Sequence, residues 1–177
     1  MFTMREAFLA VEAEILGLMK DESPWQGLYI DYHPPIVERI WCQWGAYRVS
    51  LHKMYPCGEE EALFHAHAWP QYIKIISGTQ EVGVADMRSN FPPAHLIVSS
   101  YGSGNYYEMT NPFGGHYVRP IDRPSFSVML TGSPWSVHHA PKSTKPLRQL
   151  TPEEFRKNFD FFRDYYWHHQ NDALYPV

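Results

Sequence analysis

Two histidines separated by a single residue, His65 and His67, form a pair of side chains that can bind one metal ion. They lie in a stretch with strand character, where successive side chains point to opposite faces and every second residue shares a face. Both imidazoles can therefore offer a ring nitrogen to the same divalent ion. The alternative is that the two rings are ordinary hydrogen-bonded polar groups of a half-buried strand.

A third ligand-type side chain, Gln71, follows His67 after three residues. A strand-like run over residues 72–76 then leads to a turn at Gly78. The amide of Gln71 can bind a metal through its oxygen, or it can orient bound water or substrate beside the metal. The sequence leaves both roles open. Between the histidine pair and Gln71, Pro70 lacks an amide hydrogen and predicts a kink or an edge position.

A further histidine, His116, follows a turn that contains Pro112 and Gly114. A strand-like run enters this turn, and His116 opens the returning strand. The position suits a third imidazole ligand delivered by a hairpin. His95 and His138 are rivals for the same role, and the simplest alternative is that His116 only caps the turn.

Together, these spacings resemble the two signature motifs of the cupin superfamily over residues 58–120. The first motif has His-x-His, three residues, a ligand-type side chain, six residues and a glycine; the second has a glycine, a Pro-x-Gly turn and a histidine. The chain departs from the family in having Gln71 where glutamate is usual. Gly58 lies one residue further from His65 than usual. In the second motif the first interval is longer than usual, His116 comes one residue early after Gly114, and Pro120 stands where an asparagine commonly follows.

The resemblance implies a β-barrel or jelly roll with a metal in its mouth, without reaching a particular member of the superfamily. It assigns His65, His67 and His116 as metal ligands with Gln71 nearby. Three-histidine iron sites in this superfamily look like those of dioxygenases acting on small molecules. A metal-dependent isomerase or lyase and a non-catalytic binding protein are the alternatives, because one fold serves many functions.

The proposed ligands also constrain the chemistry. Three neutral imidazoles and a neutral amide leave the charge of a divalent ion uncompensated, so such a site favours an anionic substrate. Nitrogen and oxygen ligands without thiolate suit Fe(II), which the resemblance favours, and also Mn, Ni, Cu or Zn. Open coordination positions would admit dioxygen or water.

Candidate substrate-binding residues lie on a predicted strand over residues 47–54. Arg48, Ser50 and His52 share one face of this strand, and Arg48 can hold a carboxylate through two hydrogen bonds. His52 is the second substrate-binding candidate. Tyr107, shortly before the Pro/Gly turn, is the candidate catalytic residue because it can supply a phenolic proton near the metal. The alternatives are a solvent-facing polar edge for the strand and a packing role for Tyr107.

Composition excludes several classes of protein. The chain has 177 residues, of which 44% are hydrophobic and 16% aromatic, which predicts one packed domain rather than a disordered segment. The net charge is −4 and the basic residues are scattered, which argues against a nucleic-acid or membrane partner. With only two cysteines and no secretory signal, we expect a cytoplasmic protein, and a homodimer on general grounds.

The predicted fold is mainly all-β, with a cupin-type β-barrel over residues 27–140 between two flanking helices. Thr3 and Glu6 form a capping box that begins a helix over residues 3–20. Thr151 and Pro152 begin a second helix over residues 152–168. The predicted strands cover residues 28–33, 36–43, 47–54, 63–67, 72–76, 81–84, 95–99, 106–110, 116–119 and 126–131.

Overall fold

The structure is a computed structural model that describes residues 3–88, 96–135 and 146–172. Two α-helices, α1 (Met4–Leu18) and α2 (Pro152–Asp172), and a short 3-10 helix, η1 (Glu59–Glu61), accompany the strands. The strands are β1 (Gln26–Ile30), β2 (Val37–Trp44), β3 (Tyr47–Met54), β4 (His65–Ala66), β5 (Gln71–Ser77), β6 (Thr79–Asp86), β7 (Ile97–Gly102), β8 (Tyr106–Met109), β9 (Gly114–Pro120) and β10 (Ser125–Thr131).

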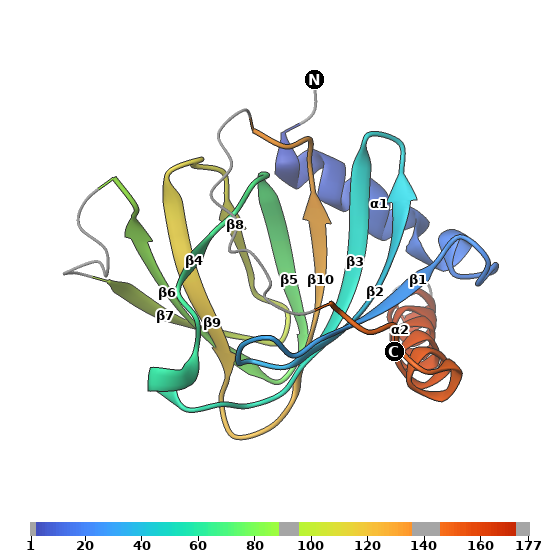
Figure 1. Cartoon of the computed structure of the whole chain (residues 1–177). Helices are drawn as coiled ribbons and strands as arrows, with labels where there is room; N and C mark the ends of the chain where they lie inside the picture. The colour runs from blue at the N-terminus through green and yellow to red at the C-terminus, as the bar shows by residue number, and fades with distance from the viewer. Residues whose placement is uncertain (1–2, 89–95, 136–145, 173–177) are drawn as a thin grey trace.

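The strands form two antiparallel sheets (Figure 1). The six-stranded sheet has the order β1-β2-β3-β10-β5-β8, and the four-stranded sheet has the order β4-β9-β6-β7. The chain passes from one sheet to the other several times, which is why strands distant in sequence, such as β3 and β10, are neighbours. The prediction of a mainly β fold with two flanking helices is confirmed. In the described residues the strands pair as two sheets rather than as one closed ring.

Helix α1 begins where the capping box predicts. The Thr3 hydroxyl accepts a hydrogen bond from the Glu6 amide at 3.2 Å, and the Glu6 carboxylate accepts one from the Thr3 amide at 2.8 Å. The apolar face of the helix is fully buried at Phe8, Val11 and Ile15. It packs on the outer face of the six-stranded sheet, so the helix supports the sheet from the side opposite the four-stranded sheet.

Helix α2 packs on the same outer face (Figure 1). Phe159, Phe162 and Tyr166 lie at helical spacing on one face of the helix and are buried. A polar contact adds to this packing, because Asn158 on the helix donates a hydrogen bond of 2.6 Å to the buried Glu38 carboxylate on β2. Neither described helix is both long and apolar enough to cross a lipid bilayer.

Alternation along β3 separates the two faces of the six-stranded sheet. Val49 and Leu51 point into the helix-covered core and are no more than 1% exposed. Ser50 and His52 therefore point the other way, toward the four-stranded sheet. The predicted boundaries of this strand are confirmed. The strand predicted over residues 63–67 is much shorter, since only His65 and Ala66 pair with β9 before the chain leaves the sheet toward Pro70.

Candidate metal centre

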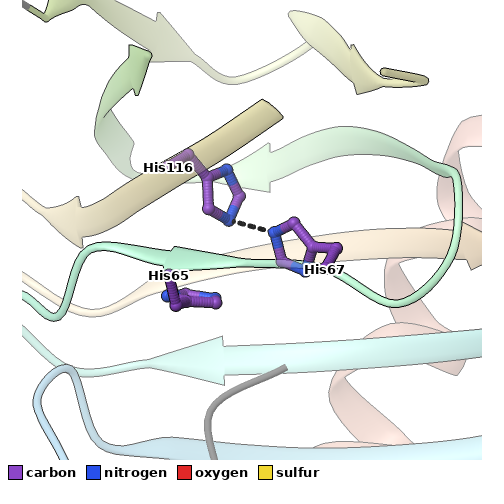
Figure 2. A group of neighbouring side chains, drawn as sticks. All are labelled: His65, His67 and His116. Atoms are coloured by element: carbon purple, nitrogen blue, oxygen red, sulfur yellow. Dashed lines mark hydrogen bonds between the residues drawn. The ribbon is translucent and has the colours of Figure 1, made fainter. Parts of the chain in front are cut away.

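Three histidines meet between the two sheets (Figure 2). His65 on β4 is the registered partner of His116 on β9, so antiparallel pairing places these two rings side by side. His67 follows two residues later, beyond the end of β4, and its ring turns toward the same point. One ring nitrogen from each histidine lies within 4.8 Å of the other two. The structure thus brings together the three imidazoles that the sequence singled out.

The His65 ring is held by the backbone. Its Nδ1 lies 2.9 Å from the carbonyl oxygen of Leu63, so Nδ1 carries the proton and donates it. The remaining nitrogen, Nε2, is then an unprotonated acceptor. Burial lowers the pKa of His65 to about 4, which keeps the ring neutral near pH 7. A neutral ring whose other nitrogen is fixed by a carbonyl is the form that binds metals.

His67 and His116 face each other through their Nε2 atoms, which are 2.7 Å apart. Burial lowers the pKa of both rings well below the ordinary value, so a single proton between two neutral rings makes this contact. The Nδ1 atom of His116 is buried and has no hydrogen-bond partner in the described part of the chain. A buried polar atom without a partner is costly, so the His116 Nδ1 atom indicates that the site is not fully satisfied by the described residues alone.

The geometry of the three rings fits a transition-metal ion. Metal–nitrogen bonds of about 2.0–2.1 Å place neighbouring ligand nitrogens about 3.0–3.4 Å apart. The shortest spacing here, between His67 and His116, is 2.7 Å and the upper bound for the group is 4.8 Å. These distances lie on either side of the required separation, so small rotations of the rings would bring the three nitrogens to the spacing that a metal ion needs. The structure therefore supports a site for a divalent transition metal.

Gln71, the first residue of β5, lies on the wall of the same cavity and is 2% exposed. Its side-chain nitrogen has no hydrogen-bond partner among the described residues. The oxygen and nitrogen of an amide are interchangeable by a flip of the group. An amide with an unused polar atom inside this cavity suits either predicted role, binding the metal or orienting a bound molecule, and both stay predictions.

The cavity that contains the histidines has a volume of about 290 Å³. This volume is near the lower end of the range for small-molecule sites. No aspartate or glutamate is among the described residues that line it. Its wall includes residues from both sheets: Ile30, Tyr32, His33, Pro35, Val37, Arg39, His52, Met54, His65, Ala66, His67, Ala68, Trp69, Gln71, Ile73, Tyr107, His116, Val118, Ser127, Met129 and Leu147.

The three other predicted site residues have different positions. His52 is 2% exposed and lines the cavity. Tyr107 on β8 also lines the cavity, and its ring centroid is 6.3 Å from that of His116. This position is compatible with the predicted catalytic role, which stays a prediction. Arg48 is not among the described lining residues. Its guanidinium instead stacks 4.8 Å from the ring centroid of Trp69 and 5.7 Å from that of Trp41.

Two basic residues of the cavity, Arg39 and His33, were not predicted. Arg39 on β2 donates a hydrogen bond of 2.7 Å from Nε to Nε2 of His52, its registered partner on β3. His33 lies with its ring centroid 5.7 Å from that of His65. The available signal for Arg39 was the alternation of the strand, which places it on the face opposite Glu38 and Ile40. The rival ligands His95 and His138 lie outside the described residues.

Comparison with known proteins shows that this chain is similar to solved structures in fold but not in sequence. No protein-family model matches the chain, and no curated protein sequence matches it. The structure of hydroxypropylphosphonic acid epoxidase from S. wedmorenis superimposes with a TM-score of 0.50 at 9% identity, over 63% of this chain and 56% of the epoxidase. The chain has a cupin fold. A variant of oxalate decarboxylase from Bacillus subtilis gives a TM-score of 0.47 at 9% identity, over 62% of this chain and 28% of the decarboxylase.

Proposed function

We propose that this cupin is a metal-dependent oxidoreductase of the dioxygenase type that acts on a small polar or anionic molecule. The observation that carries the proposal is the convergence of His65, His67 and His116 on one point inside a cavity. All three rings are neutral near pH 7 because burial lowers their pKa values. The set contains neither thiolate nor carboxylate, which suits Fe(II), the metal that the cupin resemblance favours, and also Mn, Ni, Cu or Zn.

The roles of the individual residues follow from their positions. His65, His67 and His116 would hold the ion, which when bound supplies open positions for dioxygen and substrate. Gln71 would orient a bound molecule or complete the ligand set through its amide oxygen. Tyr107 would deliver a proton from its phenol, since burial raises its pKa and keeps the hydroxyl protonated.

Metal content tests the proposal directly. The protein is purified without oxygen and without a histidine tag, and bound metals are measured in the wild type and in His67→Ala. His168→Ala, which changes an exposed histidine on α2, is the matched control. We expect near-stoichiometric iron in the wild type and the control, and loss of at least 90% of it in His67→Ala.

Oxygen uptake with candidate substrates then separates the classes of enzyme. Iron with substrate-dependent oxygen consumption supports the dioxygenase. Zinc or manganese without oxygen consumption would instead support an isomerase or lyase in which the metal acts as a Lewis acid. Absence of metal from all three proteins, even after supplementation, would contradict the proposal and leave a binding protein.

A further inference from the structure

The cavity contains a cation for which the described structure offers no counter-ion. Arg39 lines the cavity together with the three histidines, and none of the described lining residues is acidic. Burial and repulsion from Arg48 lower the pKa of Arg39 to about 10, so its guanidinium is still charged near pH 7. A partly buried charge without an opposite charge is costly, which indicates that an anionic partner completes the site.

His52 fixes the direction in which Arg39 can bind that partner. The Arg39 Nε–H is used by His52 Nε2 at 2.7 Å. Burial and the two nearby guanidinium groups lower the pKa of His52 well below its ordinary value, so Nε2 is a free acceptor for this bond. Within the described residues the two Nη groups, with four N–H donors, have no hydrogen-bond partner, so these donors remain for a ligand.

Arg39 also lies near the proposed metal ligands. Arg39, His65, His67 and His116 all line the same cavity. A cavity of about 290 Å³ allows a small molecule to reach the histidines and Arg39 at once. The second nearby cation, Arg48, lies outside the described lining and stacks on Trp69, so Arg39 is the better placed of the two.

We propose that Arg39, held by His52, binds an oxyanion of the substrate through its two Nη groups. The substrate is accordingly a small carboxylate or phosphonate whose charged end contacts Arg39 while another part reaches the three histidines. The inference names the substrate class for the proposed metal site and rests on that proposal. A planar guanidinium edge with two parallel donors matches two oxygens of either group, whereas a neutral amide lacks the charge.

Titration calorimetry with three small probes tests the inference. Acetate, methylphosphonate and neutral acetamide are added in turn to the metal-loaded and the metal-free protein. The variants are Arg39→Gln, Arg39→Lys, Arg48→Gln, His52→Leu and His52→Gln, and Arg156→Gln, which changes an exposed arginine on α2, is the matched control. Circular dichroism and thermal unfolding establish that each variant is folded before its affinity is compared.

We expect at least one anion to bind the wild type and the control at least tenfold more tightly than acetamide. Arg39→Gln should weaken that binding at least tenfold, and Arg39→Lys should weaken it less because the charge remains. His52→Leu should weaken binding while His52→Gln, which keeps an acceptor for Arg39, restores most of it. This rescue identifies His52 as a positioning residue. The stronger of acetate and methylphosphonate identifies the oxyanion.

Equal binding of acetamide, or unchanged anion binding in a folded Arg39→Gln, would overturn the inference. If Arg39→Gln does not fold, the comparison of Arg39→Lys with the wild type decides instead, and equal affinities would refute the two-donor contact. Loss of binding in Arg48→Gln alone would move the anion to Arg48 and likewise overturn it. Failure of the metal proposal remains distinguishable, because anion binding that needs Arg39 is still measurable in the metal-free protein.

Discussion

Substitution of Gly83 by alanine tests the packing of the sheet that carries His116. Gly83 on β6 is the registered partner of Tyr117 on β9, and the tyrosine ring lies across the glycine. A Cβ at position 83 would lie 2.1 Å from Cε1 of Tyr117. The ring cannot easily move away, because it is 5% exposed and its hydroxyl donates a hydrogen bond of 2.9 Å to Glu81.

The expected cost combines two effects. Overpacking a close contact costs about 1–3 kcal/mol. A hydrogen bond to a charged acceptor contributes about 1.5–3 kcal/mol and is lost if the Tyr117 ring is displaced. The effects overlap, so we expect Gly83→Ala to lower the free energy of unfolding by about 2–4 kcal/mol. For a chain of this length that corresponds to a decrease in Tm of roughly 4–16 °C.

Urea denaturation of the wild type and four variants, Gly83→Ala, Gly102→Ala, Tyr117→Ala and Gly83→Ala/Tyr117→Ala, measures this cost. Gly102→Ala is the matched control, because a Cβ at Gly102 on the neighbouring strand β7 meets no heavy atom within 4 Å. We expect it to change stability by less than about 1 kcal/mol. In a Tyr117→Ala background the ring is gone, and Gly83→Ala should then cost less than about 1 kcal/mol. An equal cost in both backgrounds would refute the reasoning, because the clash requires the tyrosine ring.

Two further predictions concern the charge of the site and the C-terminal helix. Gln71→Glu should tighten divalent-metal binding at least about tenfold and weaken acetate binding. The reason is that a carboxylate within about 4 Å of a cation gains several kcal/mol of attraction even at an effective dielectric constant of about 20. Metal titration and calorimetry measure the two affinities, and an unchanged metal affinity would place Gln71 away from the ion. Hydrogen bonds from Arg148 lower the pKa of the Glu154 carboxyl from 4.5 to about 2, so its stabilising contribution is present above about pH 4.5 and is lost as the pH falls toward 2. The stability difference between the wild type and Glu154→Gln should shrink over that interval in urea denaturation, and a difference that does not change with pH would contradict the prediction.

The sequence was informative wherever a local rule acts on neighbouring residues. The capping box at Thr3 and Glu6, and the alternation that gives β3 its boundaries, depend only on residues close in the chain. The meeting of His65 with His116 was predicted from a resemblance, since nothing local to either residue specifies the partner strand. The structure pairs His65 with His116, so the fixed spacings within the two motifs predicted a contact between residues that are distant in sequence.

The position of Arg39 in the cavity could not be predicted from the sequence. Its strand was predicted, and alternation already separated it from Ile40 and Cys42, which are buried in the helix-covered core. The sequence does not say which face of a strand points into a cavity, because both faces of a sheet between two layers are enclosed. Arg48 was chosen on the neighbouring strand by the same alternation, and the structure instead stacks it on Trp69. Only the register of β2 with β3 places Arg39 beside His52.

The two faces of the six-stranded sheet have a consequence for how this protein can change over time. On β10, as on β3, Val128 and Leu130 pack under the helices while Ser127 and Met129 line the cavity. Neighbouring positions in one strand are thus under different constraints: one position packs in the core that stabilises the fold, and the next faces the cavity that selects the ligand. A lineage can vary the cavity-facing positions and acquire new substrates while the helix-facing positions stay constant. Directed evolution confined to those alternate codons would explore chemistry at little risk to the scaffold.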